Sequence, residues 1–338
     1  METSRGFDDS TWQKMAQLGW QGVAIAEEHG GHGLGFVDLT ILLQEMGRRL
    51  LCAPFLSSVV LAAFAIEQGA SEDQKSDLLS AIAQGKTRAT LALTEPEGRW
   101  EEGAIKVSAQ RDGKDWRVSG TKMYVIDGGT AELFIVAART EKGVSLFSVS
   151  GSESGIKRSD LTTLDMTRKL ARVDFDSAGA DLLGTEGAGW SALEKALDRA
   201  AVALSAEMLG GAETCLEMAT NYARTRVQFG RQIGSFQAIK HKLATVMTEV
   251  EMARSAVQYA AWAAEHDDQE LRIAAPLCKA YCSEAFLHAA AENIQVHGGI
   301  GFTWEHDCHL YIRRAKSSEI MLGDADHHRE LLAQRLGI

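Results

Sequence analysis

The sequence predicts a mainly helical protein with a small β domain and a C-terminal helical bundle. The 338 residues include 32 Gly and only 3 Pro, and the second half carries long Ala-rich amphipathic patterns, a composition that favours long helices joined at glycines. After Gly85 the pattern changes to short β-branched runs. We therefore expect an N-terminal α domain over residues 1–85, a β domain over 86–185 and a helical bundle over 186–338.

The N-terminal domain reads as helices separated by a glycine-rich turn. Residues 8–84 carry helical apolar periodicity, as in "LTILLQEMGRRL", and the stretch "EEHGGHGLGFVDL" forms the turn. Ser71 precedes acidic residues and begins a helix that we expect to end near Gly85.

The middle segment alternates apolar and polar residues with the period of strands. The predicted strands lie in the runs "TRATLALTEP", "WRVSG", "ELFIVAART", "VSLFSVS" and "ARVDFDSA". Gly, Asp and Ser separate these runs, as expected of turns between short strands.

The bundle is predicted from three long amphipathic patterns, from Trp190 to Arg224, from Ser235 to Glu265 and from Asp268 to Val296. Two shorter helices follow, one from Trp304 to Leu322 and one over "ADHHRELLAQRLGI". Their many Ala positions favour close antiparallel packing.

Composition restricts the possible partners and compartment. A net charge of −11 argues against a general nucleic-acid or anionic-membrane surface. No apolar run approaches the roughly 20 residues that a membrane span needs, and no leader-like N-terminus is present, so we expect a cytoplasmic protein. The five scattered cysteines form no disulfide pattern, and Cys278 and Cys282 are expected to be buried thiols.

The stretch "RTRVQFGRQIGSFQ", residues 224–237, joins two predicted helices and concentrates Arg, Gly, Phe and Gln. Ser235 is the expected N-cap of the following helix, whose free amides beside Arg226 and Arg231 would favour a phosphate or pyrophosphate. Phe229 offers a face for a flat ring, and Gln237 offers an amide. The alternative interpretation is a solvated helix hairpin.

A second glycine cluster, "IQVHGGIGF", follows the next long helix. Taken alone it is a helix stop. Its glycines also allow a ligand or a neighbouring helix to approach the backbone closely.

Together these motifs resemble the acyl-CoA dehydrogenase family over nearly the whole chain. The matching stretches are "RVQFGRQIGSFQAIKHKLA", "IQVHGGIGFTWEHDCHLYIRRAK", "EEHGGHGLGFVDL", "LALTEP" and "VSGTKMYVIDGGTAELFIVAART". The resemblance implies that residue 8 corresponds to the start of a later helix of the family, so we expect no counterpart of the first family helix in this sequence.

The resemblance implies FAD-dependent α,β-desaturation of an acyl-CoA thioester, with electrons passing to an electron-transfer flavoprotein. In the family a Glu removes the α-proton while the β-hydride passes to the flavin. This chain has Leu322 at one family base position and Ala200 at the other. General base catalysis contributes roughly 10²- to 10⁴-fold to the reaction rate. We therefore expect the dehydrogenase activity of this chain alone to be low. Glu319 is a weak substitute candidate, as are Asp324 and Glu207.

The positions that face the flavin ring also depart from the family pattern. After the Thr-Glu-Pro strand the chain has Glu97, Arg99 and Trp100 in place of a Gly- and Ser-rich turn, and the hydroxyl of an aromatic-aliphatic-hydroxyl triplet is lost at Ile126, after Tyr124 and Val125. Asp324 and Asp326 would repel a pyrophosphate.

The positions that hold the adenine and pyrophosphate of a neighbouring subunit's FAD are retained. They are Arg226, Gln228, Phe229, Gln237, Gln295, Gly298 and Gly299. The pattern resembles the base-lacking subunit of heteromeric, steroid-side-chain type acyl-CoA dehydrogenases, and implies a paralogous catalytic partner in a heterotetramer that degrades fatty acids or steroid side chains. Two alternatives stay open: a self-sufficient enzyme with a non-standard base, and a redox-silent assembly paralogue.

Several other polar residues are expected to have structural roles. His327 and His328 are adjacent on a helix and face different directions. The segment "EHDCHL" mixes metal-ligand types, but we expect a packed helix there and no metal site. Arg313 and Arg314 serve subunit contacts, the CoA phosphate or the surface; the sequence does not separate these roles.

Overall fold

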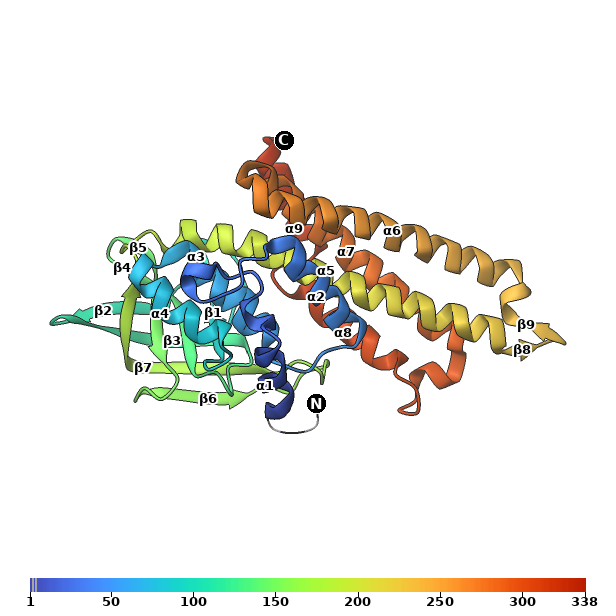
Figure 1. Ribbon diagram of the computed structural model, residues 1–338, viewed down its shortest axis with the longest axis horizontal. Helices are drawn as coiled ribbons and strands as arrows, with labels where there is room; N and C mark the ends of the chain where they lie inside the picture. Colours follow the sequence, from blue (N-terminus) through green and yellow to red (C-terminus); the bar gives the residue numbers. More distant parts are fainter. Residues whose placement is uncertain (2, 4) are drawn as a thin grey trace. The chain divides into compact units, whose positions relative to one another are not determined.

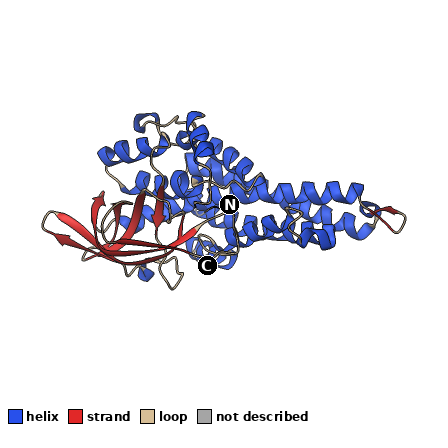
Figure 2. Cartoon of the chain, turned by 90° about the horizontal axis from the view of Figure 1, so that it is seen from below, coloured by secondary structure: helices blue, strands red, loops and turns tan. Residues whose placement is uncertain are grey.

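The computed structural model describes residue 1, residue 3 and residues 5–338, and divides into two compact units. The first unit comprises residues 1–35 and 52–200, and the second comprises residues 36–51 and 201–338. The predicted class, mainly α with a small β region, is confirmed. Figure 2 shows the strands of the large sheet as one block and a separate small hairpin at the end of long helices.

The helices of the first unit are α1 (Asp9–Gln17), the π-helical segment Leu56–Ala62, α3 (Ala63–Gly69) and α4 (Glu72–Ala83). The expected cap of α4 is present as a capping box between Ser71 and Gln74. The π-helical segment lies on the sheet, where Ser58 bonds both to the N–H and to the C=O of Ala89.

The sheet has seven strands: β1 (Ala89–Ala92), β2 (Ser108–Asp112), β3 (Asp115–Ile126), β4 (Leu133–Thr140), β5 (Gly143–Ser150), β6 (Ile156–Asp160) and β7 (Leu170–Leu183). The pairings run in a ring from β2 through β3, β7, β5 and β4 back to β2, with β1 beside β4 and β6 beside β7. Phe134, Phe147 and Trp116 pack inside this ring.

The second unit consists of α2 (Phe36–Arg48), most of α5 (Gly189–Thr225), α6 (Gln237–His266), α7 (Asp268–His297), α8 (Cys308–Ile320) and α9 (Ala325–Leu336), and the hairpin of β8 (Val227–Gln228) and β9 (Arg231–Gln232) (Figure 1). The three long helices are confirmed to within a few residues. Glycines let helices touch: a Cβ atom on Gly210 of α5 would lie 1.9 Å from the carbonyl oxygen of Gln44 in α2.

Two sequence expectations about secondary structure need correction. Strands β2 and β6 were missed because they are polar and mostly exposed, so they lack the apolar alternation that marks a strand. The predicted helix from Trp304 to Leu322 is shorter, because residues 303–307 form turns before α8. By contrast, Cys278 and Cys282 are buried thiols as expected, with their sulfurs 3.9 Å apart.

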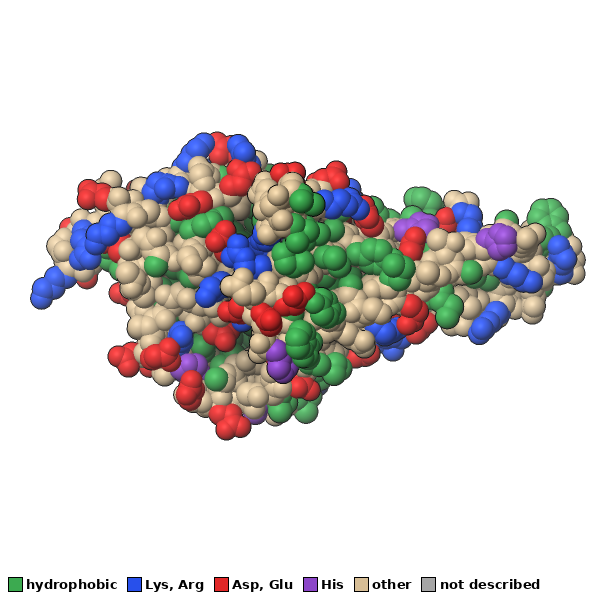
Figure 3. All heavy atoms as spheres, turned by 90° about the horizontal axis from the view of Figure 1, so that it is seen from above, with side chains coloured by type: hydrophobic (Ala, Val, Ile, Leu, Met, Phe, Trp, Pro, Cys, Tyr) green, Lys and Arg blue, Asp and Glu red, His purple; other side chains and the backbone are tan. Residues whose placement is uncertain are grey.

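The surface carries mixed charge. On the face drawn in Figure 3, acidic and basic side chains intermingle, and apolar side chains gather on the helical unit. No helix within the described part of the chain is both long enough and apolar enough to cross a membrane.

Candidate functional site

The residues of the expected anion site meet at one end of the helical unit. Helix α5 ends at Thr225, and the chain reverses through the β8–β9 hairpin before α6 begins. The reversal is tight because Phe229 and Gly230 both have positive φ (53° and 77°), the backbone of a type I′ turn. A small apolar cluster of Ala219, Ala223 and Val296 joins the ends of α5 and α7. The hairpin and the end of α7, with Gln295, therefore lie at the same end of the unit.

The start of α6 differs from the sequence expectation. Ser235 is not the N-cap, because α6 begins at Gln237 after Phe236, which makes no side-chain cap. The Ser235 hydroxyl instead donates to the carbonyl of Gln232 at 2.7 Å. The first amides of α6 consequently receive no cap from a side chain, which leaves the helix N-terminus available to an anion.

The seven nucleotide-site candidates are all exposed: Arg226, Gln228, Phe229, Gln237, Gln295, Gly298 and Gly299. The Phe229 ring is 91% exposed at the hairpin tip, although it lies edge-on to Phe236 at a centroid distance of 6.2 Å. Arg231 stacks over Phe236 with its guanidinium carbon 4.0 Å from the ring centroid. Within the described residues, no acid or ring partners the Arg226 side chain. The Arg226 guanidinium and the exposed Phe229 ring together form a surface that is typical of a binding site.

The two glycines after α7 are not required by this chain's own packing. A Cβ atom built on Gly298 or on Gly299 meets no heavy atom of the described chain within 4 Å. Gly298 has a positive φ of 65°, a reason to be glycine, whereas no positive φ applies to Gly299. Gly299 thus fits close approach by a molecule outside this chain.

The loop that contains the expected base position is buried and held by two titratable side chains. Leu322 has a φ of 62° and is 7% exposed. Lys279 of α7 donates through Nζ to the carbonyls of Glu319 and Gly323, each at 3.0 Å. His328 of α9 donates through Nε2 to the carbonyl of Leu322 at 3.0 Å. These bonds satisfy carbonyls at the end of α8 and stabilise the left-handed residue.

Burial shifts the pKa values of both side chains. Burial lowers the pKa of Lys279 to about 8, and Glu319 and Asp324 nearby oppose that shift. Burial and the neighbouring Lys279 lower the pKa of His328 to about 3, so the ring is neutral near pH 7. Lys279 is not placed as a free general base, because its Nζ donates to backbone carbonyls. In His328 the Nδ1 atom has no hydrogen-bond partner within the described residues, but a pKa of about 3 makes it a weak base.

The three candidate carboxylates all have partners within the second unit. Glu319 pairs with Lys316 at 2.6 Å. Asp324 caps α9 by accepting from the backbone N–H of His327 at 2.9 Å. Glu207 forms a buried ion pair with Arg314 at 2.5 Å, and both side chains are under 10% exposed. Ala200, at the other family base position, is 1% exposed and offers no polar side-chain atom.

In the first unit, the expected flavin-ring positions lie along β3 and the turn after β1. Tyr124 has a φ of 58° at a bulge between β3 and β7 and is 47% exposed. Arg99 pairs with Glu101, and Glu97 pairs with Lys106, all on the surface. These charged pairs occupy the turn where the family has small and hydroxyl residues.

A buried ion pair lies behind this turn. Lys122 of β3 donates to Glu95 at 2.8 Å and to the carbonyl of Leu93 at 2.9 Å. Glu95 also accepts from the backbone N–H groups of Lys106 and Val107. Burial lowers the pKa of Lys122 to about 8, while the bond to Glu95 opposes the shift. The pair anchors the turn and leaves Glu95 no free role in proton transfer.

Comparisons with known proteins agree with the observed fold. The sequence model of the acyl-CoA dehydrogenase N-terminal domain matches residues 1–86. The models of the middle and C-terminal domains match residues 90–178 and 187–337. "Acyl-CoA dehydrogenase IpdE2" of Mycobacterium tuberculosis is 34% identical over 95% of this chain and 85% of its own length. This chain belongs to the acyl-CoA dehydrogenase family.

Solved acyl-CoA dehydrogenase structures share the fold. A "Tcur3481-Tcur3483 steroid ACAD" variant has a TM-score of 0.90 and 32% identity, and the match covers 99% of this chain and 90% of that one. The "ChsE4-ChsE5 complex from Mycobacterium tuberculosis" has a TM-score of 0.91 and 29% identity, with 99% and 90% covered. The chain is an oxidoreductase of the acyl-CoA dehydrogenase type. The family generally binds FAD.

For this acyl-CoA dehydrogenase, Glu319→Gln is expected to leave turnover of the assembled enzyme within about twofold. The Glu319 carboxylate already pairs with Lys316, and the residue contacts the base-position loop through its backbone carbonyl, which accepts from Lys279. A general base would instead lose roughly 10²- to 10⁴-fold on neutralisation. Steady-state turnover with an artificial electron acceptor measures the difference, and a loss of about 100-fold or more would make Glu319 the base.

From the sequence alone, neither Lys279 nor His328 has an expected role at this loop. Lys279 is fully buried within an Ala- and Cys-rich face, and a lysine at an apolar position of a helical pattern was the available signal. His328 was considered only with its neighbour His327. The two rings lie at 88° to each other, and only His328 is buried and bonded to the loop.

Proposed function

We propose that this chain is one subunit of a heteromeric FAD-dependent acyl-CoA dehydrogenase, in which it binds the adenine and pyrophosphate of FAD held by a paralogous catalytic subunit. The observation that carries the proposal is the contrast between its two sets of family positions. The nucleotide-site residues are exposed, whereas the base positions hold Leu322 and Ala200 and each candidate carboxylate is paired or serves as a helix cap.

The residues present fit the nucleotide end of FAD. The uncapped start of α6 and the Arg226 guanidinium suit the pyrophosphate, since helix N-termini and arginine both bind phosphate oxygens. Phe229 offers a face to the adenine, and Gly299 leaves room for close approach. When bound, the flavin would accept the hydride from the acyl β-carbon.

The relatives support the heteromeric arrangement. Two of the similar solved structures are named for pairs of proteins, the Tcur3481-Tcur3483 steroid ACAD variant and the ChsE4-ChsE5 complex. We propose an acyl-CoA substrate of the fatty acid or steroid side-chain class and an electron-transfer flavoprotein as acceptor. A paralogous subunit would supply the missing carboxylate and flavin-ring contacts, and heterotetramers would result from pairing such dimers.

The test is co-expression of this chain with a candidate paralogue, followed by flavin absorbance and native mass spectrometry. We expect little flavin on the chain alone and one FAD per two chains in the complex. A chain that purifies alone with one flavin and oxidises an acyl-CoA at ordinary rates would establish self-sufficiency instead. A stable complex without any flavin would indicate a redox-silent assembly subunit.

We call the seven nucleotide-site candidates the clamp. A substitution in the clamp tests whether this chain contributes to FAD binding by the complex. Arg226→Ala in this chain should weaken FAD retention by the complex about 10- to 100-fold, because a charge-assisted hydrogen bond contributes about 1.5–3 kcal/mol and about 1.4 kcal/mol is tenfold. Arg272→Ala, which removes an exposed arginine from α7 of the same unit, is the matched control. Equal flavin loss from both variants would contradict a specific role for Arg226.

Gly299→Ala separates ligand binding from folding. The new Cβ meets nothing in this chain, so the unfolding midpoint should stay unchanged while the flavin content of the complex falls. Gly103→Ala in the first unit, where a Cβ atom also meets nothing, is the control that should change neither quantity.

A further inference from the structure

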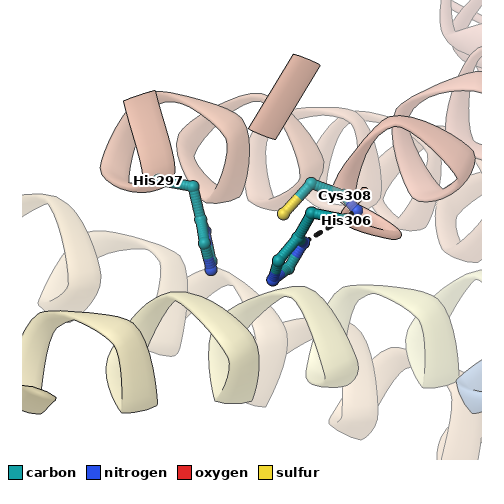
Figure 4. A group of neighbouring side chains, drawn as sticks. All are labelled: His297, His306 and Cys308. Atoms are coloured by element: carbon teal, nitrogen blue, oxygen red, sulfur yellow. Dashed lines mark hydrogen bonds between the residues drawn. The ribbon is translucent and has the colours of Figure 1, made fainter. Parts of the chain in front are cut away.

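Two histidines and a cysteine meet beside the clamp, in a cluster that includes no clamp residue and neither family base position. His297 ends α7, Cys308 begins α8, and His306 lies in the turn between them. One nitrogen of each ring and the Cys308 sulfur lie within 4.8 Å of one another. In Figure 4 the rings of His297 and His306 point in the same direction, and the Cys308 sulfur lies between them.

We propose that His297, His306 and Cys308 form a binding site for a borderline transition-metal ion such as Zn²⁺. Two imidazoles and a thiolate suit zinc or cobalt, whereas magnesium and calcium prefer oxygen ligands. Zinc bond lengths place donor atoms of a tetrahedral site roughly 3.5 Å apart, so small side-chain rotations close the group around an ion.

The ring orientation of His297 fits this role. Its Nδ1 lies 2.8 Å from the carbonyl of Asn293, and because a carbonyl only accepts, Nδ1 carries the hydrogen and Nε2 keeps its lone pair. A histidine that donates its other nitrogen to a backbone carbonyl is the usual arrangement at metal sites. The ring is 5% exposed and stacks on Tyr222 at 4.3 Å, which holds it in place.

His306 provides the more adaptable ligand. It is partly exposed, so it offers an ion a path from solvent. Its Nδ1 accepts only a long contact of 3.3 Å from the backbone N–H of Cys308. Replacing that contact by a metal bond costs little. The rings of His297 and His306 lie 4.4 Å apart, centroid to centroid.

A fourth group points independently to a missing ligand. Asn293 is fully buried, and within the described chain its side-chain oxygen has no hydrogen-bond partner. Asn293 lies one helical turn before His297, whose ring donates to the Asn293 backbone carbonyl, and its side-chain nitrogen lies 3.9 Å from the Met218 sulfur. A water molecule that completes a tetrahedral metal site would donate to the side-chain oxygen and satisfy it. Without such a donor, the desolvation of this oxygen is not compensated.

The site would act on the clamp. His297 directly precedes Gly298 and Gly299, and His306 and Cys308 end the same connection between α7 and α8. A metal ion would therefore tie the two ends of residues 298–307 together and restrict the conformations of the clamp glycines.

The sequence predicts a packed helix over residues 305–310 and no metal site, and no local pattern links this segment to His297. In the structure, residues 303–307 form turns, so the predicted helix begins only at Cys308. His306 therefore lies before α8, and Cys308 is the first residue of α8.

Cobalt(II) added to chelator-treated protein is the direct probe. We expect about one equivalent to bind, with a thiolate-to-cobalt charge-transfer band in the near ultraviolet and ligand-field bands in the visible. Cys308→Ser should abolish the charge-transfer band, and His306→Asn should weaken cobalt binding at least about tenfold. Cys278→Ser, a buried thiol in α7 outside the cluster, and His309→Gln are controls that should keep the band.

X-ray absorption of the zinc-loaded wild-type chain identifies the metal ligands directly. It uses no substituted protein, so misfolding of a variant cannot affect the result. Two nitrogen ligands and one sulfur ligand are expected, together with a zinc-dependent rise in the unfolding midpoint. Absence of sulfur from the zinc shell, or a charge-transfer band that persists in Cys308→Ser, would overturn the proposal.

Discussion

Replacing Arg314 with methionine is expected to lower the free energy of unfolding of the helical unit by about 3–5 kcal/mol, because it leaves a buried carboxylate without its counter-ion. Arg314 of α8 donates to Glu207 of α5 at 2.5 Å, and the two side chains are 3% and 8% exposed. Urea unfolding followed by far-ultraviolet circular dichroism, with hydrogen exchange to localise the loss, measures the change.

The control for Arg314 is an exposed pair in the same unit. Arg329→Ala removes the contact to Glu284, where both side chains are about half exposed, and should cost at most about 1 kcal/mol. The double variant Glu207→Leu with Arg314→Met should recover much of the loss, since an apolar pair has no charge to desolvate. A loss below about 1 kcal/mol for Arg314→Met would show that Glu207 is free to act otherwise, including as a base.

Acid is expected to destabilise the loop around Leu322 through His328. The folded pKa of about 3 lies below the ordinary value of 6.5, so the unfolded chain binds more protons between these values. Stability therefore falls as pH drops through this window, by about 2 kcal/mol between pH ~7.5 and pH ~5 for this one side chain. Unfolding midpoints measured at these two pH values test the effect.

The variant His328→Gln isolates the histidine from the carboxylates that titrate in the same range. It retains an amide that can donate to the carbonyl of Leu322, so folding at the higher pH should survive, but the pH dependence of the unfolding midpoint should shrink. His266→Gln, which replaces an exposed ring at the end of α6, should keep the wild-type dependence. An unchanged pH dependence in His328→Gln would refute the assignment.

Elements with strong periodicity were predictable from sequence. Helices α6 and α7 begin within two residues of their expected starts, since long amphipathic patterns contain many repeated apolar positions. Strands β2 and β6 were not predictable, because their order comes from pairing with β3 and β7 rather than from their own residues. Ser235 is not the N-cap because it ends a short 3-10 turn over Ile233–Ser235, so that Phe236 is the residue before α6. The Ser235 hydroxyl donates to the carbonyl of Gln232.

The sequence by itself determined the fold class, the family motifs and the absence of a carboxylate at Leu322 and Ala200, because these follow from residue types and local spacing. Only the tertiary structure decided which side chains are engaged. Glu207 meets Arg314, Lys279 and His328 meet the loop at Leu322, and His297 meets Cys308. Such contacts join residues from separate helices, and distances between helices depend on packing that no local pattern encodes.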